Sequence, residues 1–189
     1  FPLRSFFPNL CCHEPEPPTA ALLAALLGLS QCQKTDPDPA SQLPAATQTG
    51  ANTFGCLLNG QPWTPQGNDG TSNYTVDYDH TYHGGNLGVK TYRINGKFFQ
   101  YIIFGGDSIP GPGNYSLNRA PKTVFFTDSQ NPTACQDYDG LAGQYRRGTL
   151  TITRLDRQAG IISGTFAFTL YKPGCDSVRV TQGRFDKRL

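Results

Sequence analysis

The sequence predicts an all-β fold, an antiparallel sandwich or barrel of about nine to eleven short strands. Composition supports this prediction in two ways. The 189 residues include 21 Gly and 15 Pro, and the only glutamates are Glu14 and Glu16, close to the N-terminus. Because helix surfaces are usually built from Glu, Lys, Ala and Leu, a helical bundle is excluded. The third observation is a hydrophobic period of two from Phe54 onward, which is typical of strands.

Alternation of apolar and polar side chains marks the individual strands. Apolar residues at 74, 76 and 78 alternate with polar ones, and Val178 and Val180 alternate with Arg179 and Thr181. The segments 148–154 and 161–171 carry Thr on their polar side. Each of these segments is expected to have one buried face and one wet face.

The segment 97–104 differs, because large apolar residues occur on both sides of the predicted strand. It is therefore expected to be a central strand that is covered on both faces. Asn95-Gly96 precedes it and predicts a hairpin turn, and Asn59-Gly60 predicts a second one. Residues 156–160 are expected to join the strands at 148–154 and 161–171.

An apolar run of ten residues, from Ala20 to Leu29, is followed by Cys32 and then by a polar, Pro-rich segment. A bilayer needs roughly 20 apolar residues, so the run fits the apolar core of a secretory signal better than a membrane span. The pattern resembles a bacterial lipoprotein signal, which implies lipidation of Cys32 and a membrane anchor. A short buried helix beside an unrelated cysteine is the alternative.

Three parts of the chain follow from this pattern. Residues 1–31 are the signal-like N-terminal segment, and residues 32–50 are the lipidated Cys32 and a flexible tether. The tether has few large apolar side chains to offset the entropy of ordering. Residues 51–189 form the all-β domain, which is long enough for a single core.

Three stretches of the domain carry a family resemblance. They read NTFGCLLNG at 52–60 before Trp63, GTLTITRLD at 148–156, and SGTFAFT at 163–169 leading to VTQGRFD at 180–186. Their order resembles an uncharacterised all-β lipoprotein domain family of Bacteroidota, a domain of unknown function. The resemblance implies a lipid-anchored β-domain exported to the outer membrane or cell surface, and it implies no substrate.

The cysteines of the domain are Cys56, Cys135 and Cys175, and an exported location favours a disulfide. If the hairpin between 148–154 and 161–171 turns near residue 158, Cys175 lies opposite Leu141, and Cys135 is within reach on the neighbouring entry loop. We therefore predict a Cys135–Cys175 disulfide and a buried Cys56 thiol. The rival pairings join Cys56 to Cys135 or to Cys175.

Charge is small overall but unevenly distributed. A formal net charge of +2 argues against a nucleic-acid partner. Residues 141–189 hold nine Lys or Arg and three Asp, whereas residues 51–140 hold five and seven. Five arginines could form a binding face for an acidic glycan or an envelope protein, or they could be solvated outward positions. They are Arg146, Arg147, Arg154, Arg179 and Arg184.

The densest cluster of potential metal ligands is Asp77, Asp79, His80 and His83. It suggests a metal-dependent hydrolase as an alternative function, although a polar loop between strands explains the same residues. The chain has no Gly-x-Ser-x-Gly motif and no short Cys-x-x-Cys pair in the domain. We expect no cofactor, and we expect a binding or structural role rather than catalysis.

Overall fold

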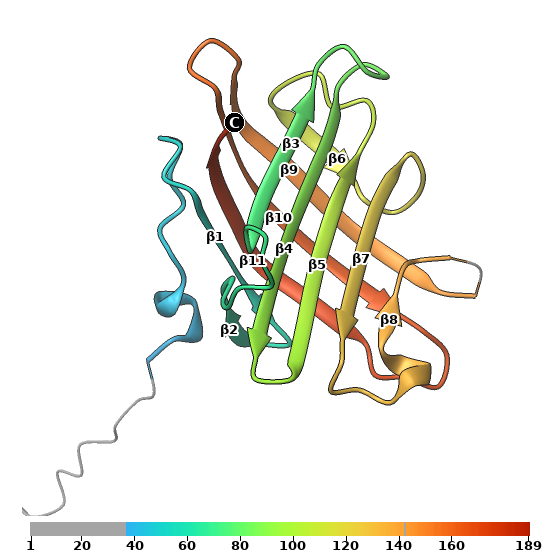
Figure 1. The fold of residues 1–189 in the computed structure, drawn as a ribbon. Coiled ribbons are helices and arrows are strands. Elements are labelled where there is room, and N and C mark those ends of the chain that lie inside the picture. Colours follow the sequence, from blue (N-terminus) through green and yellow to red (C-terminus); the bar gives the residue numbers. More distant parts are fainter. Residues whose placement is uncertain (1–36, 142) are drawn as a thin grey trace, which may run out of the picture. The chain divides into compact units, whose positions relative to one another are not determined.

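The computed structural model describes residues 37–141 and 143–189. Pro37–Leu189 forms one compact unit with eleven strands in two antiparallel sheets (Figure 1). The all-β prediction is confirmed. The signal-like segment 1–31 and Cys32 lie outside the described residues. Among the residues that are described, no helix has the length and apolar character needed to cross a membrane.

The first sheet has six strands in the order β2-β1-β11-β10-β9-β6, and all their pairings are antiparallel. Three of the strands are long and contain the alternating segments described above. The strands are β1 (Thr53–Leu58), β2 (Gln61–Trp63), β6 (Gly113–Ser116), β9 (Tyr145–Asp156), β10 (Ile161–Tyr171) and β11 (Val178–Arg188).

The second sheet has five strands in the order β3-β4-β5-β7-β8. The predicted central strand is β5, which pairs with β4 on one side and β7 on the other. The strands are β3 (Tyr74–Asp79), β4 (Asn86–Asn95), β5 (Phe98–Gly106), β7 (Lys122–Asp128) and β8 (Asp137–Tyr138). Two short 3-10 helices, η2 (Pro39–Gln42) and η3 (Thr133–Cys135), complete the unit.

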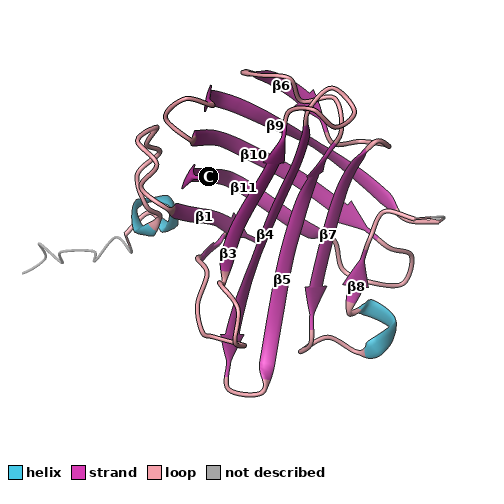
Figure 2. Cartoon of the chain, turned by 45° about the horizontal axis from the view of Figure 1, so that its top comes forward, coloured by secondary structure: helices cyan, strands magenta, loops and turns pink. Residues whose placement is uncertain are grey.

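The two sheets face each other and enclose one apolar core, and Figure 2 shows their strands crossing. Aromatic rings from both sheets meet in it. The ring centroids of Phe104 from β5 and Phe166 from β10 are 4.4 Å apart, and Phe54 from β1 lies 5.2 Å from Phe166. Burial of such large side chains stabilises the sandwich by roughly 1.5–3 kcal/mol each.

The predicted tight turns are confirmed. Asn59 and Gly60 both have positive φ, 49° and 83°, and they connect β1 to β2. Gly96, with φ of 61°, lies in the two-residue connection between β4 and β5. Such turns match the twist of the strands that they join, which is why Asn and Gly are favoured there.

The predicted flexible tether is wrong for the part that the structure describes. Residues 37–52, which we call the strap, lie along β1 and the end of β11. Leu43 of the strap is buried, and Pro44 packs on Gly55 of β1 so closely that a Cβ there would lie 2.7 Å from the proline ring. The compact unit therefore begins at Pro37 rather than at residue 51.

The strap is held by Asp186, a carboxylate of β11 that is fully buried. Burial opposes its ionisation, but hydrogen bonds to the carboxylate outweigh this effect and hold the pKa of Asp186 well below its usual range. The donors are the Thr47 hydroxyl (2.6 Å), the Thr49, Gly50 and Ala51 amides (2.8–3.0 Å) and the Ser163 hydroxyl (2.7 Å).

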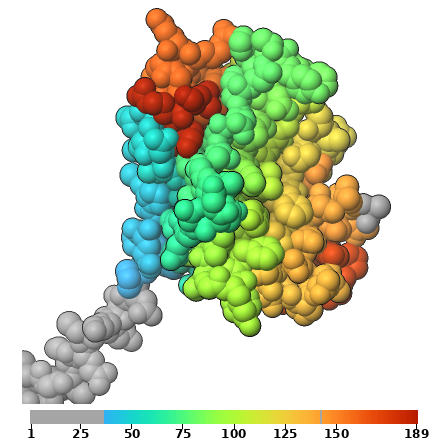
Figure 3. Space-filling view, viewed as in Figure 1, coloured from blue at the N-terminus to red at the C-terminus, as the bar shows by residue number. Residues whose placement is uncertain are grey.

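Part of the outer face of the five-stranded sheet is covered by the chain's own segment between β2 and β3. Residues 64–73, between β2 and β3, lie on that face, where Figure 3 shows them in teal and green. Tyr92 is fully buried beneath them, and its hydroxyl accepts a hydrogen bond from the Asp69 amide at 3.1 Å. The Tyr101 hydroxyl donates to the Asp69 carboxylate at 3.1 Å.

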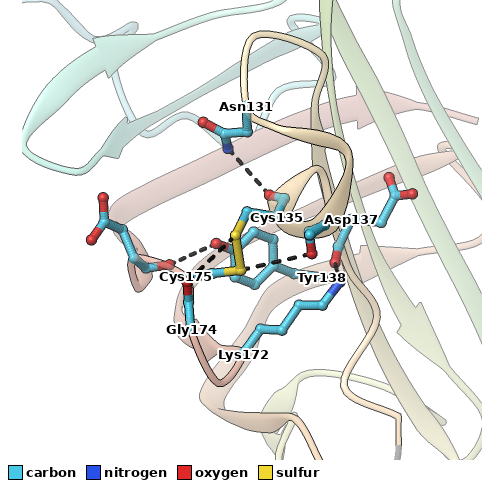
Figure 4. The surroundings of a disulfide bond; sticks show 9 residues. Asn131, Cys135, Asp137, Tyr138, Lys172, Gly174 and Cys175 are labelled. Carbon is cyan, nitrogen blue, oxygen red and sulfur yellow. Dashed lines mark hydrogen bonds between the residues drawn. A yellow bond between two sulfur atoms is a disulfide. The ribbon is translucent and has the colours of Figure 1, made fainter.

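The predicted Cys135–Cys175 disulfide is present, with its Cα atoms 5.5 Å apart. It joins η3 to the loop that connects β10 and β11 (Figure 4). The Tyr138 hydroxyl of β8 donates to the Asp176 carbonyl at 2.6 Å and adds a second tie to the same loop. Cys56 is a free, fully buried thiol as expected, and burial raises its pKa to about 12 although the charge of Arg93 opposes this.

Candidate functional site

The outward face of the six-stranded sheet follows from the period of two along its long strands. Leu150 and Ile152 of β9 point into the core, so Arg147, Thr149 and Thr151 point outward. The same alternation turns Arg179 of β11 outward beside the buried Val178 and Val180.

Register aligns two of the outward arginines. Arg147 pairs with Thr169 of β10, and Thr169 pairs with Arg179 on its other side. With neighbouring strands about 4.8 Å apart, the two arginine Cα atoms are about 10 Å apart. Within the described part of the chain, neither guanidinium makes a hydrogen bond or an ion pair. Two exposed positive charges therefore flank one threonine.

Two adjoining hollows of about 440 and 480 Å³ extend along this face. They share Thr149 and Ala167, and their outward-facing lining consists mostly of threonine, alanine and glycine. Such short side chains leave the surface low between the longer arginines. We call this continuous depression the outer trough, and it is defined by Arg147, Thr149, Ala167, Thr169, Arg179 and Thr181.

Two exposed tyrosines lie next to the arginine row. Tyr145 of β9 and Tyr171 of β10 pair directly, two residues beyond the Arg147–Thr169 pair. Their exposed fractions are 48% and 42%, which is high for aromatic side chains. Both point outward, so the open end of the outer trough combines cationic and aromatic side chains.

Arg154 and Arg184 also lie on this outer face, but they bind the strap. Arg154 donates to the Gln48 carbonyl at 2.6 Å and to the Asp156 carboxylate at 2.8 Å. Arg184 donates to the Gln182 carbonyl at 3.2 Å and to the Pro44 carbonyl at 3.4 Å. These two arginines therefore belong mainly to the fold.

Arg146 does not face the outer trough. It is adjacent to Arg147 in β9, and neighbouring residues of a strand point to opposite faces. Its guanidinium donates to the Lys122 carbonyl of β7 at 2.7 Å, and its stem packs on Gly140. The five predicted arginines thus separate into an open pair, a strap-binding pair and one residue that connects the two sheets.

The predicted Asp and His cluster is not gathered into one site. Asp79 accepts hydrogen bonds from the amide and hydroxyl of Thr81, so it stabilises its own turn. His83 bonds to Asp107 at 2.8 Å, and Asp77 is exposed on β3. Over residues 37–141 and 143–189 there is no group of three or more His, Cys, Asp and Glu that could hold a metal ion.

His80 lies instead in a wide, open groove of about 1060 Å³ at the β9–β10 turn, which Arg154, Asp156 and Arg157 also line. Arg154 and Asp156 are bonded to each other there. Arg157 is therefore the one arginine of the groove whose side chain has no bond within the described residues, whereas the outer trough has two such arginines side by side. The unpaired arginines of the outer trough make that surface the stronger candidate.

No known protein family, curated protein or solved structure matches this chain. The candidate site therefore depends on the geometry of the chain's own residues. Sequence reasoning missed the exposed Tyr145–Tyr171 pair, although alternation along β9 and β10 placed both side chains on the outward face with Arg147.

Proposed function

We propose that this chain is an exported, lipid-anchored envelope protein whose β-domain binds an acidic polysaccharide along the outer trough. The observation that carries the proposal is the row Arg147–Thr169–Arg179, in which two exposed guanidinium groups have no partner among the described residues. Unpaired arginines in a fixed row favour an anionic ligand with repeated charges.

A polysaccharide is favoured over a compact anion because the outer trough is long and open. The two hollows continue past Thr149 and Ala167 toward Ala46 of the strap, so an extended chain has room to lie along them. Threonine hydroxyls can exchange hydrogen bonds with sugar hydroxyls. Tyr145 and Tyr171 supply exposed aromatic faces against which sugar rings can pack.

Export and anchoring are supported by the sequence and the disulfide. The apolar run Ala20–Leu29 and Cys32 suggest a lipoprotein signal, and both lie outside the described residues. The Cys135–Cys175 disulfide fits an oxidising compartment. We propose the outer membrane or the cell surface as the location and a lipid at Cys32 as the membrane partner. Mass spectrometry of the native protein tests the anchor, since an unmodified Cys32 would contradict it.

Binding to polygalacturonate and to neutral dextran, measured by calorimetric titration of the full chain, tests the proposed ligand class. We expect binding to polygalacturonate that weakens as salt is raised, because exposed charge pairs are screened. Dextran should not bind. The double variant Arg147→Gln/Arg179→Gln should weaken binding about 30-fold, since each exposed ionic contact contributes about 1 kcal/mol.

A matched control removes the same charge from the opposite sheet. Lys90 and Lys97 are exposed, and they approach the rings of Tyr101 and Phe98. Lys90→Gln/Lys97→Gln should leave binding almost unchanged. Equal losses in both double variants would mean that only net charge matters, and the outer trough would be rejected as the site. If no polysaccharide binds, a pull-down from an envelope extract tests the other ligand class. An envelope protein that wild type retains and Arg147→Gln/Arg179→Gln does not would identify a protein ligand instead.

A further inference from the structure

Another hollow lies between the two sheets, at the end of the sandwich where β1 turns into β2 and where β4 ends. Its volume is about 310 Å³, and we call it the mouth pocket. β1 and β2 supply one wall and the five-stranded sheet supplies another. The lining residues that matter here are Gln61, Trp63, Arg93, Gln100, Asp128 and Asp176.

Three polar residues form a row across the five-stranded sheet inside this pocket. Arg93 of β4 pairs with Gln100 of β5, and Gln100 pairs with Asp128 of β7. All three are in phase with core residues of their own strands, such as Val89 and Ile102, so they point between the sheets. With two strand spacings between them, the Cα atoms of Arg93 and Asp128 are about 10 Å apart.

The middle and one end of the row are fixed by hydrogen bonds. The Trp63 indole donates to Gln100 Oε1 at 2.8 Å, and Gln100 Nε2 donates to Asp128 Oδ2 at 2.6 Å. The backbone N–H of Gln130 donates to Asp128 Oδ1 at 2.9 Å. Gln100 and Asp128 are therefore held in one orientation before any ligand arrives.

Arg93 is the exception in the row. Within the described residues its guanidinium makes no hydrogen bond and no ion pair, and its Nε is buried without an acceptor. Its one described partner is the Trp63 ring, whose centroid lies 5.8 Å from the guanidinium carbon. A buried donor on a charged group is costly to leave unsatisfied. The chain thus supplies a cation at the pocket without supplying its anion.

The charges of the mouth pocket are opposite at its two sides. Arg93 is positive, and Asp128 and the exposed Asp176 are negative, and neither carboxylate lies within ion-pair distance of Arg93. A ligand with a single charge would satisfy one side and be repelled by the other. A ligand that carries both charges satisfies both sides at once.

We propose that the mouth pocket binds a free α-amino acid with a small polar side chain. Its carboxylate contacts the terminal nitrogens of Arg93, and its ammonium group faces Asp128 and Asp176. The α-carboxylate and α-ammonium groups of an amino acid are fixed to one carbon, so a single small molecule presents both charges that the pocket lacks. The side-chain amides of Asn59, Gln61 and Asn131, which also line the pocket, suit a polar side chain.

This inference is independent of the proposed function, because the two sites use different side chains. The outer trough is on the outward face of the six-stranded sheet, whereas the mouth pocket opens from between the sheets. Trp63, the single tryptophan of the chain, lines the mouth pocket. Its indole N–H resonance therefore reports on this site alone.

Titration of the full chain with L-serine, L-asparagine and L-glutamine, followed through the Trp63 indole resonance, tests the proposal. We expect a saturable shift with at least one of them. The N-acetyl derivative of the amino acid that binds lacks the ammonium group, and the α-carboxamide derivative lacks the carboxylate. Neither derivative should therefore produce the shift. Arg93→Gln should weaken binding by about tenfold or more, because it removes a charge-assisted hydrogen bond.

Two further variants separate the outcomes. Asp128→Asn should also weaken binding, whereas Arg147→Gln/Arg179→Gln should bind the amino acid as wild type does and be weakened only in its affinity for the polysaccharide. Melting curves verify that each variant is folded. An indole resonance that does not move up to about 10 mM of all three amino acids, or one that moves equally in Arg93→Gln, would overturn the proposal.

Discussion

The outer face of the six-stranded sheet has two halves that use the same residue types differently. In the half next to the strap, Asp186, Arg154 and Arg184 all bind strap atoms. In the other half, the guanidinium groups of Arg147 and Arg179 bind no described residue. Charge alone therefore does not mark a binding surface on this face. What distinguishes the open half is that the chain provides no partner for its charges.

The outer face of the five-stranded sheet resembles the strap half. Asp69 organises the covering segment 64–73, and hydrogen bonds from Thr71 and Tyr92 lower its pKa to about 2. Tyr101 contacts the same carboxylate. An aspartate therefore holds a covering segment on each sheet, and the outer trough is the part of the six-stranded sheet's outer face that the strap leaves open.

The hydrogen bonds that Asp186 accepts from the strap, which we call the clamp, are expected to matter most for stability. Asp186→Asn should destabilise the domain by about 4 kcal/mol, because a buried carboxylate that accepts several hydrogen bonds is replaced by an amide that cannot accept them all. Denaturant unfolding measures this change. The matched control is Asp77→Asn, an exposed carboxylate on β3, for which a change of no more than about 0.5 kcal/mol is expected.

The same clamp predicts a pH dependence. Because the folded-state pKa of Asp186 is lowered, its contribution is fully present above its unfolded pKa of about 4 and is lost as pH falls through the folded-state pKa. Wild type should therefore lose stability on acidification below about pH 4. Asp186→Asn should lose less over the same range, and parallel curves for the two proteins would argue against the clamp.

Removal of the disulfide should cause the second-largest loss of stability. Cys135→Ala/Cys175→Ala opens a loop whose ends are 40 residues apart and should lower the free energy of unfolding by about 3 kcal/mol. Unfolding of wild type with and without reductant provides the same comparison without a mutation. The disulfide is distant from the strap, so its loss should add to the effect of Asp186→Asn rather than overlap with it.

A smaller difference in stability is expected between a strap-binding arginine, Arg154, and an arginine without a partner among the described residues, Arg179. Arg154→Gln should destabilise the domain by about 1 kcal/mol, because it removes bonds to Gln48 and Asp156. Arg179→Gln should change stability by less than about 0.5 kcal/mol. Equal losses of stability in the two variants would remove the distinction between the halves.

Much of the fold could be predicted because its signals are local. Alternation located the long strands, and the hairpin register brought Cys135 near Cys175. The outward direction of Arg147 and Arg179 followed from the buried valines and leucines beside them. The same rule places Arg146 on the other face, so grouping it with Arg147 by charge was wrong for a reason that the sequence contained.

Other features depend on contacts between distant residues and had no local signal. The strap amides meet Asp186 across about 136 positions of the chain, so the polar composition of residues 33–50 suggested only flexibility. Arg93 is an intermediate case. Arg93 is four residues from the buried Val89 on the same strand, so alternation predicts that its side chain points inward. The bond between Gln100 and Asp128, which leaves Arg93 without an acceptor, is visible only in the structure.

The most direct test of the outer trough is to map where a short acidic oligosaccharide binds. In a titration with oligogalacturonate followed by backbone amide resonances, we expect the largest changes at Arg147, Thr169 and Arg179, with Tyr145 and Tyr171 next. Asp69 and Asp186 should change little. Changes confined to the residues around Asp69 or to the strap, or no changes at all, would contradict the claim that the open half of the six-stranded sheet is the binding surface.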